Sequence, residues 1–96
     1  VSADFITRMG ELGYRKLSAA DLTRLRDHGV TASFVSGLKE LGYTDLTADD
    51  LVRLRDHGVT SGYAQRLNAG GPLLTPQELI RLRDRGARSR ADLARE

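Results

Sequence analysis

Few residues of this sequence could do chemistry, and the histidines recur at one position of a repeated pattern. His28 and His57 each follow Leu-Arg-Asp and precede a glycine. Such a histidine could ligate a metal, act as a general base or respond to pH. Arg85 takes the same place in a later copy, and an arginine keeps only the favourable interaction of a cation with the carbonyls at a helix C-terminus. The exchange of histidine for arginine at this repeated position therefore favours a structural role for His28 and His57.

Other catalytic signatures are missing from the sequence. There is no cysteine, no HExxH pair and no GxxxxGK[ST] or GxSxG motif, so no zinc site, phosphate loop or serine nucleophile is predicted. No apolar run approaches the roughly 20 residues that span a bilayer. We expect no enzyme activity, no cofactor or metal, no small-molecule substrate and no membrane contact by this segment.

A recurring arginine is the best candidate for a recognition surface. It occurs at Arg24, Arg53 and Arg81, and helical geometry directs it away from the leucine seam, into solvent. Such a stripe suits an acidic protein segment or phosphates. The alternative is a solvated face, because each arginine has a carboxylate three residues before it and another three residues after it. A second set of arginines flanks the seam, where their alkyl stems can cover the core edge. These are Arg26, Arg55 and Arg83.

These residues are placed by an internal repeat. When Phe5–Ser33 is laid over Phe34–Gly62, 17 of the 29 positions are identical. A third copy begins at Tyr63 and is one residue shorter in its middle. We therefore expect a single repeat domain over residues 1–96, with units of about 1–29, 30–58 and 59–86 and a partial cap over 87–96.

The sequence pattern of each unit predicts two short helices with capped ends. Thr31 is a plausible N-cap, and the Gly42-Tyr43 pair fits a Schellman stop in which Tyr43 covers Leu38. Packing explains the aromatic positions, and a role of the tyrosine hydroxyls in binding a partner stays an open alternative. Second helices begin with a hydroxyl residue followed three positions later by an acid, as in a capping box. The structural columns are the seam leucines Leu25, Leu54 and Leu82, the terminal glycines Gly29, Gly58 and Gly86, and the first-helix aromatics Phe5, Phe34 and Tyr63.

Composition limits the fold and the partners. The chain has 96 residues, of which 40% are apolar, and its 15 basic and 13 acidic side chains give a net charge of +2. That near balance argues against nonspecific nucleic-acid binding. A hairpin with two or three large apolar residues per helix buries too little surface to stand alone. The predicted fold is all-α, with tandem helix pairs stacked as a short α-solenoid or closed into a compact bundle.

The second unit resembles a known kind of repeat. Residues 51–60, LVRLRDHGVT, preceded by GYTDL at 42–46, are similar to bacterial Leu-Arg-Asp-His-Gly-Val helical repeats that follow the membrane zinc metallopeptidase domain of antirepressor-type regulators. The metallopeptidase's HExxH is absent, so the resemblance transfers no catalytic residue. Residues 25–34 also resemble the bacterial short C-terminal domain, which is associated with oligomerisation but lacks the tandem organisation.

Together these patterns predict a noncatalytic helical-repeat module for protein–protein interaction or spacing within a larger bacterial regulatory protein. Its partner would be another protein or a second copy of the chain. Two alternatives stay open. One is self-association through the leucine seams of end repeats, and the other is nucleic-acid binding through the stripe formed by Arg24, Arg53 and Arg81.

Overall fold

A computed structural model describes residues 3–14, 16–44 and 46–95 of the chain. These residues form only helices, which confirms the predicted all-α fold. The helices are α1 (Ala3–Glu11), α2 (Ala19–Asp27), α3 (Ala32–Leu41), α4 (Ala48–Asp56), α5 (Ser61–Asn68), α6 (Pro76–Asp84) and the short 3-10 helix η1 (Arg90–Arg95). Each unit therefore supplies one pair, α1 with α2, α3 with α4 and α5 with α6.

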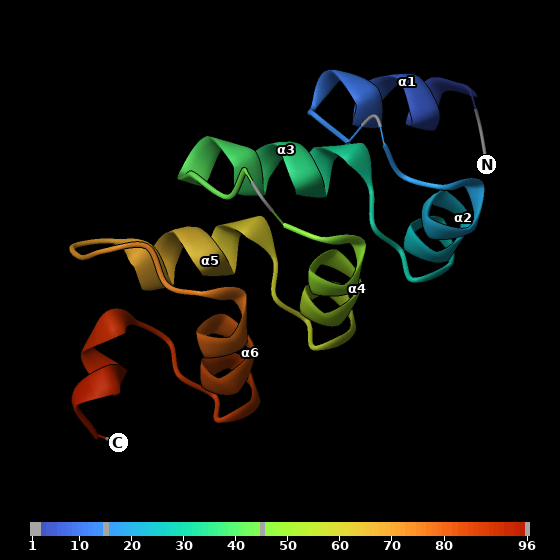
Figure 1. Ribbon diagram of the computed structural model, residues 1–96. Helices are drawn as coiled ribbons and strands as arrows, with labels where there is room; N and C mark the ends of the chain where they lie inside the picture. The colour runs from blue at the N-terminus through green and yellow to red at the C-terminus, as the bar shows by residue number, and fades with distance from the viewer. Residues whose placement is uncertain (1–2, 15, 45, 96) are drawn as a thin grey trace.

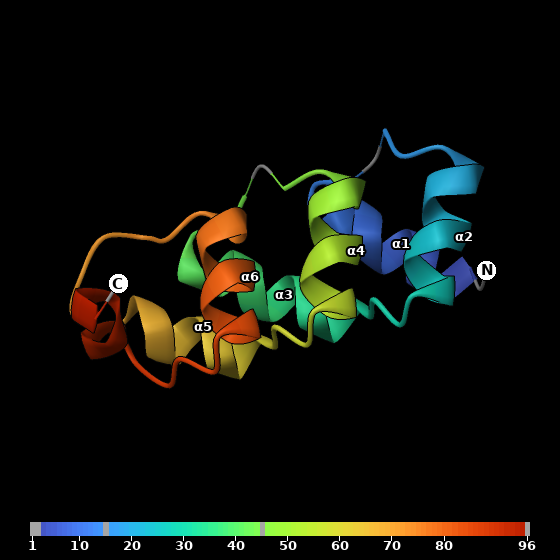
Figure 2. The same cartoon turned by 90° about the horizontal axis from the view of Figure 1, so that it is seen from below.

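The pairs stack into two rows of helices. Helices α1, α3 and α5 lie side by side in a first row, and α2, α4 and α6 form a second row that runs at a steep angle to the first (Figure 1 and Figure 2). The molecule measures 44 × 21 × 17 Å along its principal axes. Its long axis is thus more than twice either short axis, as expected when repeats contact only their neighbours in a short solenoid.

Hydroxyl side chains begin five of the six α-helices. Ser18, Thr31, Thr47, Thr60 and Thr75 each accept a hydrogen bond from the backbone N–H three residues later. The predicted capping box is complete at Thr47 and Thr75, where the carboxylates of Asp50 and Glu78 accept from the N-cap backbone. Bonding to the N–H and then the hydroxyl of Thr75 lowers the pKa of Glu78, so this cap weakens as pH falls through that pKa.

Glycines in the left-handed conformation end five of these helices. Gly58 has φ of +76°, which other residues adopt only with strain. Its N–H donates to the Arg55 carbonyl at 3.1 Å, and the next N–H, of Val59, donates to Leu54 at 2.9 Å. The same Schellman pattern recurs at Gly13, Gly29, Gly42 and Gly86. Helix α5 differs, because its C-cap Ala69 is extended and Gly70 takes the positive φ, of 83°.

The core is a continuous apolar seam between the rows. Leu25 and Leu54 are fully buried and Leu82 is 1% exposed, as befits the seam leucines, and the described core holds no buried polar or charged residue. Phe34 is buried, whereas Phe5 and Tyr63 pack against the core from its edge. The partial cap contains η1, which packs on α5 where another first helix would lie.

Close approach of α3 and α5 depends on Gly37. A Cβ built on Gly37 would lie 2.7 Å from the Cβ and Oγ of Ser61, which is closer than real contacts allow. We expect Gly37→Ala to lower the free energy of unfolding by about 1–2 kcal/mol because the two helices must separate. Urea denaturation should show that Ser61→Gly restores part of this loss, and strictly additive effects of the two changes would contradict the contact.

Candidate interaction surface

Arg24, one of the three arginines of the candidate stripe, contacts the neighbouring repeat. Arg24, Arg53 and Arg81 are all exposed and lie on consecutive helices of the second row. The Arg24 guanidinium forms an ion pair with Asp49 of α4, a partner outside its own helix that the sequence did not predict. The stacking of α2 beside α4 brings this carboxylate within reach. At the position equivalent to Asp49, the third repeat carries the neutral Gln77, so this ion pair cannot recur for Arg53.

The histidines also join repeats. Nδ1 of His28 lies 2.8 Å from a carboxylate oxygen of Asp56, and Nδ1 of His57 lies 3.0 Å from one of Asp84. Each histidine caps one helix of the second row and meets the last residue of the next. Sequence reasoning placed these histidines at helix ends but missed the carboxylates. The sequence shows an Asp at the same position of every unit, but not that packing brings it to the histidine of the preceding unit.

Two of the arginines that flank the seam, Arg55 and Arg83, lie over aromatic rings of the first helices. The Arg55 guanidinium lies 5.6 Å from the centre of the Phe34 ring, and that of Arg83 lies 5.7 Å from the centre of the Tyr63 ring. Sequence reasoning predicted that the alkyl stems would flank the core but not that the guanidinium groups would cover these rings. Each contact joins the second helix of a unit to its first, and the charged group stays exposed. Arginine and aromatic groups thus recur together along one side of the stack.

The hydroxyls of Tyr43 and Tyr63 donate to backbone carbonyls of loops, which favours the structural role of these tyrosines over binding of a partner. The buried Tyr43 donates to the Leu74 carbonyl and accepts from Nδ2 of Asn68 at 2.9 Å. Oδ1 of Asn68 accepts from the Leu74 N–H at 2.7 Å. Burial raises the pKa of Tyr43, an effect partly offset by Asn68. The Tyr63 hydroxyl donates to the Ala87 carbonyl at 2.7 Å.

Removal of the Tyr43 hydroxyl should destabilise the loop after α5. We expect Tyr43→Phe to lower the free energy of unfolding by about 1–2 kcal/mol, because the Leu74 carbonyl and the Asn68 amide lose a buried partner. Chemical denaturation of Tyr43→Phe, Asn68→Ala and the double variant measures this network. The double variant should cost less than the sum of the two single changes, and simple additivity would contradict the shared network.

The described residues contain no cluster of three or more His, Cys, Asp or Glu side chains that could hold a metal ion. Among the helices of the same residues, none has the length and apolar character needed to cross a membrane. Asp49 and Asp56 instead form ion pairs between repeats, and Arg55 lies over the Phe34 ring.

No family model, curated protein or solved structure matches this chain. The resemblance to Leu-Arg-Asp-His-Gly-Val repeat arrays therefore stays a prediction from the sequence.

Proposed function

We propose that the chain is a noncatalytic helical-repeat module that binds or spaces other proteins within a larger bacterial regulatory protein. The observation that carries the proposal is the column of exposed arginines stacked on aromatic rings, at Arg55 with Phe34 and at Arg83 with Tyr63. Arginine and tyrosine are enriched among the residues that dominate binding energy at protein interfaces. An elongated stack presents such groups at regular intervals, as repeat proteins do on their binding surfaces.

A structural role for the histidines supports the absence of catalysis. A His–Asp pair could orient an imidazole as a general base, but here the same pair occurs at His28 with Asp56 and at His57 with Asp84. A feature that repeats with the packing is expected of an interface between units. An active site would instead need a convergent set of different groups at one place.

Site-specific photocrosslinking tests this function in the cells that produce the protein. A photoreactive residue at Ser33 or Gln65, both exposed in the first row, should form an adduct with another protein. The same residue at Thr23, which is exposed at the end of the second row, is the matched control and should give less of it. Equal adducts from all three positions, or none from any, would count against the proposal.

Self-association is a second candidate, favoured by one exposed apolar side chain. Ile6 is 47% exposed, whereas the equivalent Val35 and Ala64 are buried between neighbouring first-row helices. A second copy could cover Ile6 at this end of the stack. Light scattering after size exclusion should then show a dimer that Ile6→Lys converts to monomer, and a monomer at every concentration would remove this candidate.

Nucleic-acid binding through Arg24, Arg53 and Arg81 has weaker support. The Arg24 charge is already paired with Asp49, and nonspecific affinity depends on cations that are free to neutralise phosphates. Titration of labelled DNA at low salt tests this alternative, which predicts an affinity that falls steeply as salt is added.

A further inference from the structure

A basic groove lies beside the start of α5 and the turn after α6. It has a volume of about 590 Å³. Among the described residues, its lining includes Tyr63, Ala87 and the three arginines Arg66, Arg83 and Arg88. This lining includes three arginines and no acidic side chain. The arginines come from α5, from α6 and from the segment before η1, so the stacking of the third repeat brings their charges together.

The wall of the groove is held by internal contacts. The Arg83 guanidinium lies over the Tyr63 ring, and its Nε donates to the Gly58 carbonyl at 3.3 Å. The Tyr63 hydroxyl donates to the Ala87 carbonyl at 2.7 Å. One arginine and one ring are thereby fixed before any ligand arrives, which lowers the ordering cost of binding.

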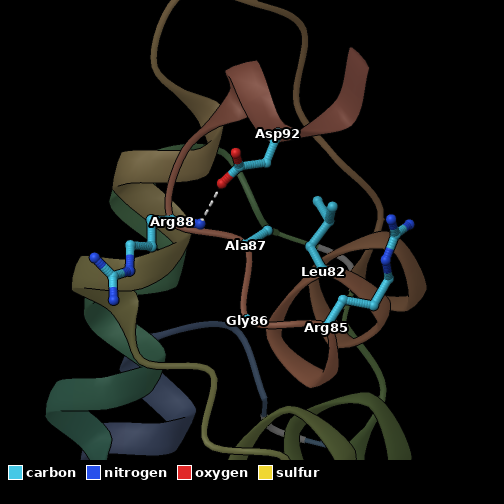
Figure 3. Close-up of a pocket in the computed structure, with 6 residues that line it drawn as sticks. All are labelled: Leu82, Arg85, Gly86, Ala87, Arg88 and Asp92. Atoms are coloured by element: carbon cyan, nitrogen blue, oxygen red, sulfur yellow. Dashed lines mark hydrogen bonds between the residues drawn. The ribbon is translucent and has the colours of Figure 1, made fainter. Parts of the chain in front are cut away.

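Arg88 lies in the turn that precedes η1 and lines this groove. Its backbone N–H donates to the Asp92 carboxylate at 2.7 Å. Figure 3 shows the Arg88 side chain leaving the backbone on the side opposite Arg85, toward the region where α5 lies. Both Arg66 and Arg88 are exposed, so their guanidinium groups are accessible from solvent.

Equivalent grooves in the other repeats carry less positive charge. In the first repeat the corresponding groove is lined by Arg8 and Arg26 together with the acidic Asp4. In the second repeat, Gly37 and Thr60 stand where the third repeat has Arg66 and Arg88. The basic character is therefore concentrated in one groove and does not continue along the stack.

We propose that this groove binds a short acidic segment of a partner protein, whose carboxylates pair with the guanidinium groups of Arg66, Arg83 and Arg88. Guanidinium and carboxylate groups form strong, directional hydrogen bonds. A nucleic-acid strand would need positive charge spread over several phosphates along its path, whereas here the second-repeat groove interrupts that path. The inference rests on the proposed function and names the chemistry of one partner.

Fluorescence anisotropy with a labelled peptide of alternating Glu and Ser residues tests the groove. The intact 96-residue chain should bind the peptide saturably at low salt, and Arg66→Glu or Arg88→Glu should weaken binding by about tenfold or more. Lys16→Glu is the matched control, because it makes the same charge change at an exposed residue between α1 and α2, outside the groove. It should weaken binding by less than about twofold. Circular dichroism checks that each variant keeps its helices.

Several outcomes would overturn the inference. Absence of saturable binding would do so, as would equal weakening by Lys16→Glu, which would indicate attraction to net charge alone. Tighter binding of single-stranded DNA, or displacement of the peptide by inorganic phosphate at equal concentration, would assign the groove to another anion. Photocrosslinks from Ser33 or Gln65, combined with failure of the peptide, would reject this groove and leave the proposed function standing. Peptide binding without cellular adducts would support an anion-binding groove and reject the proposed function.

Discussion

Replacing Leu54 with alanine should lower the free energy of unfolding by about 2–5 kcal/mol. Leu54 is fully buried at the centre of the seam, so truncation removes apolar contacts and leaves a cavity that the neighbouring helices fill only in part. A domain of this size has a total stability of roughly 5–14 kcal/mol. The variant should therefore lose a large share of its stability, and urea denaturation followed by far-UV circular dichroism measures the change.

Leu73 supplies the matched control for this substitution. It is 45% exposed, so Leu73→Ala removes the same atoms from a site that is already in contact with water. Its effect should stay within about 0.5 kcal/mol. Equal urea midpoints for Leu54→Ala and the unmodified chain would mean that burial of Leu54 in the seam does not stabilise the fold.

The second large effect is expected at Gly58. Gly58→Val should cost about 2 kcal/mol, because a β-branched residue resists the left-handed conformation. A Cβ at this position would lie 3.6 Å from Nε of Arg83, which is ordinary contact, whereas the two further methyl groups of valine would press on that guanidinium. The thermal unfolding midpoint should fall accordingly.

Asparagine separates backbone strain from other effects at the same position. Because Asn tolerates positive φ better than other residues with a Cβ, Gly58→Asn should cost less than about half as much as Gly58→Val. Equal losses for the two variants would show that contact with Arg83, rather than the backbone, sets the cost.

Much of the fold is predictable because its helix ends and its core positions are determined by residues close together in the sequence. The N-cap at Thr47, the glycine stop at Gly58 and the seam at Leu54 each depend on residues within a few positions along the chain. Three units repeat these signals, so a helix boundary predicted in one unit is supported by the same residues in the others. The third unit departs at the end of α5, where Asn68 binds Tyr43 and Leu74. The sequence shows that this copy is one residue shorter in its middle, but it does not show this network.

Contacts between units could not be read from the sequence in the same way. The Arg24–Asp49 pair and the His28–Asp56 pair depend on which faces of neighbouring helices meet, and that register follows from packing over a whole repeat. The basic groove depends on it too, since Arg66, Arg83 and Arg88 come together only after α5, α6 and the following turn are assembled. Periodicity identified the columns but not the partners across them.

The contacts between neighbouring units also determine the order in which the units can fold. His28 meets Asp56 across 28 positions, and Tyr43 reaches Leu74 across 31. The entropy needed to close a loop is therefore similar at both junctions, because it grows only slowly with loop length. Folding can start at either junction and spread to the remaining unit, with the stronger junction forming first. The order of assembly is thus a property that point substitutions at a single junction can reverse.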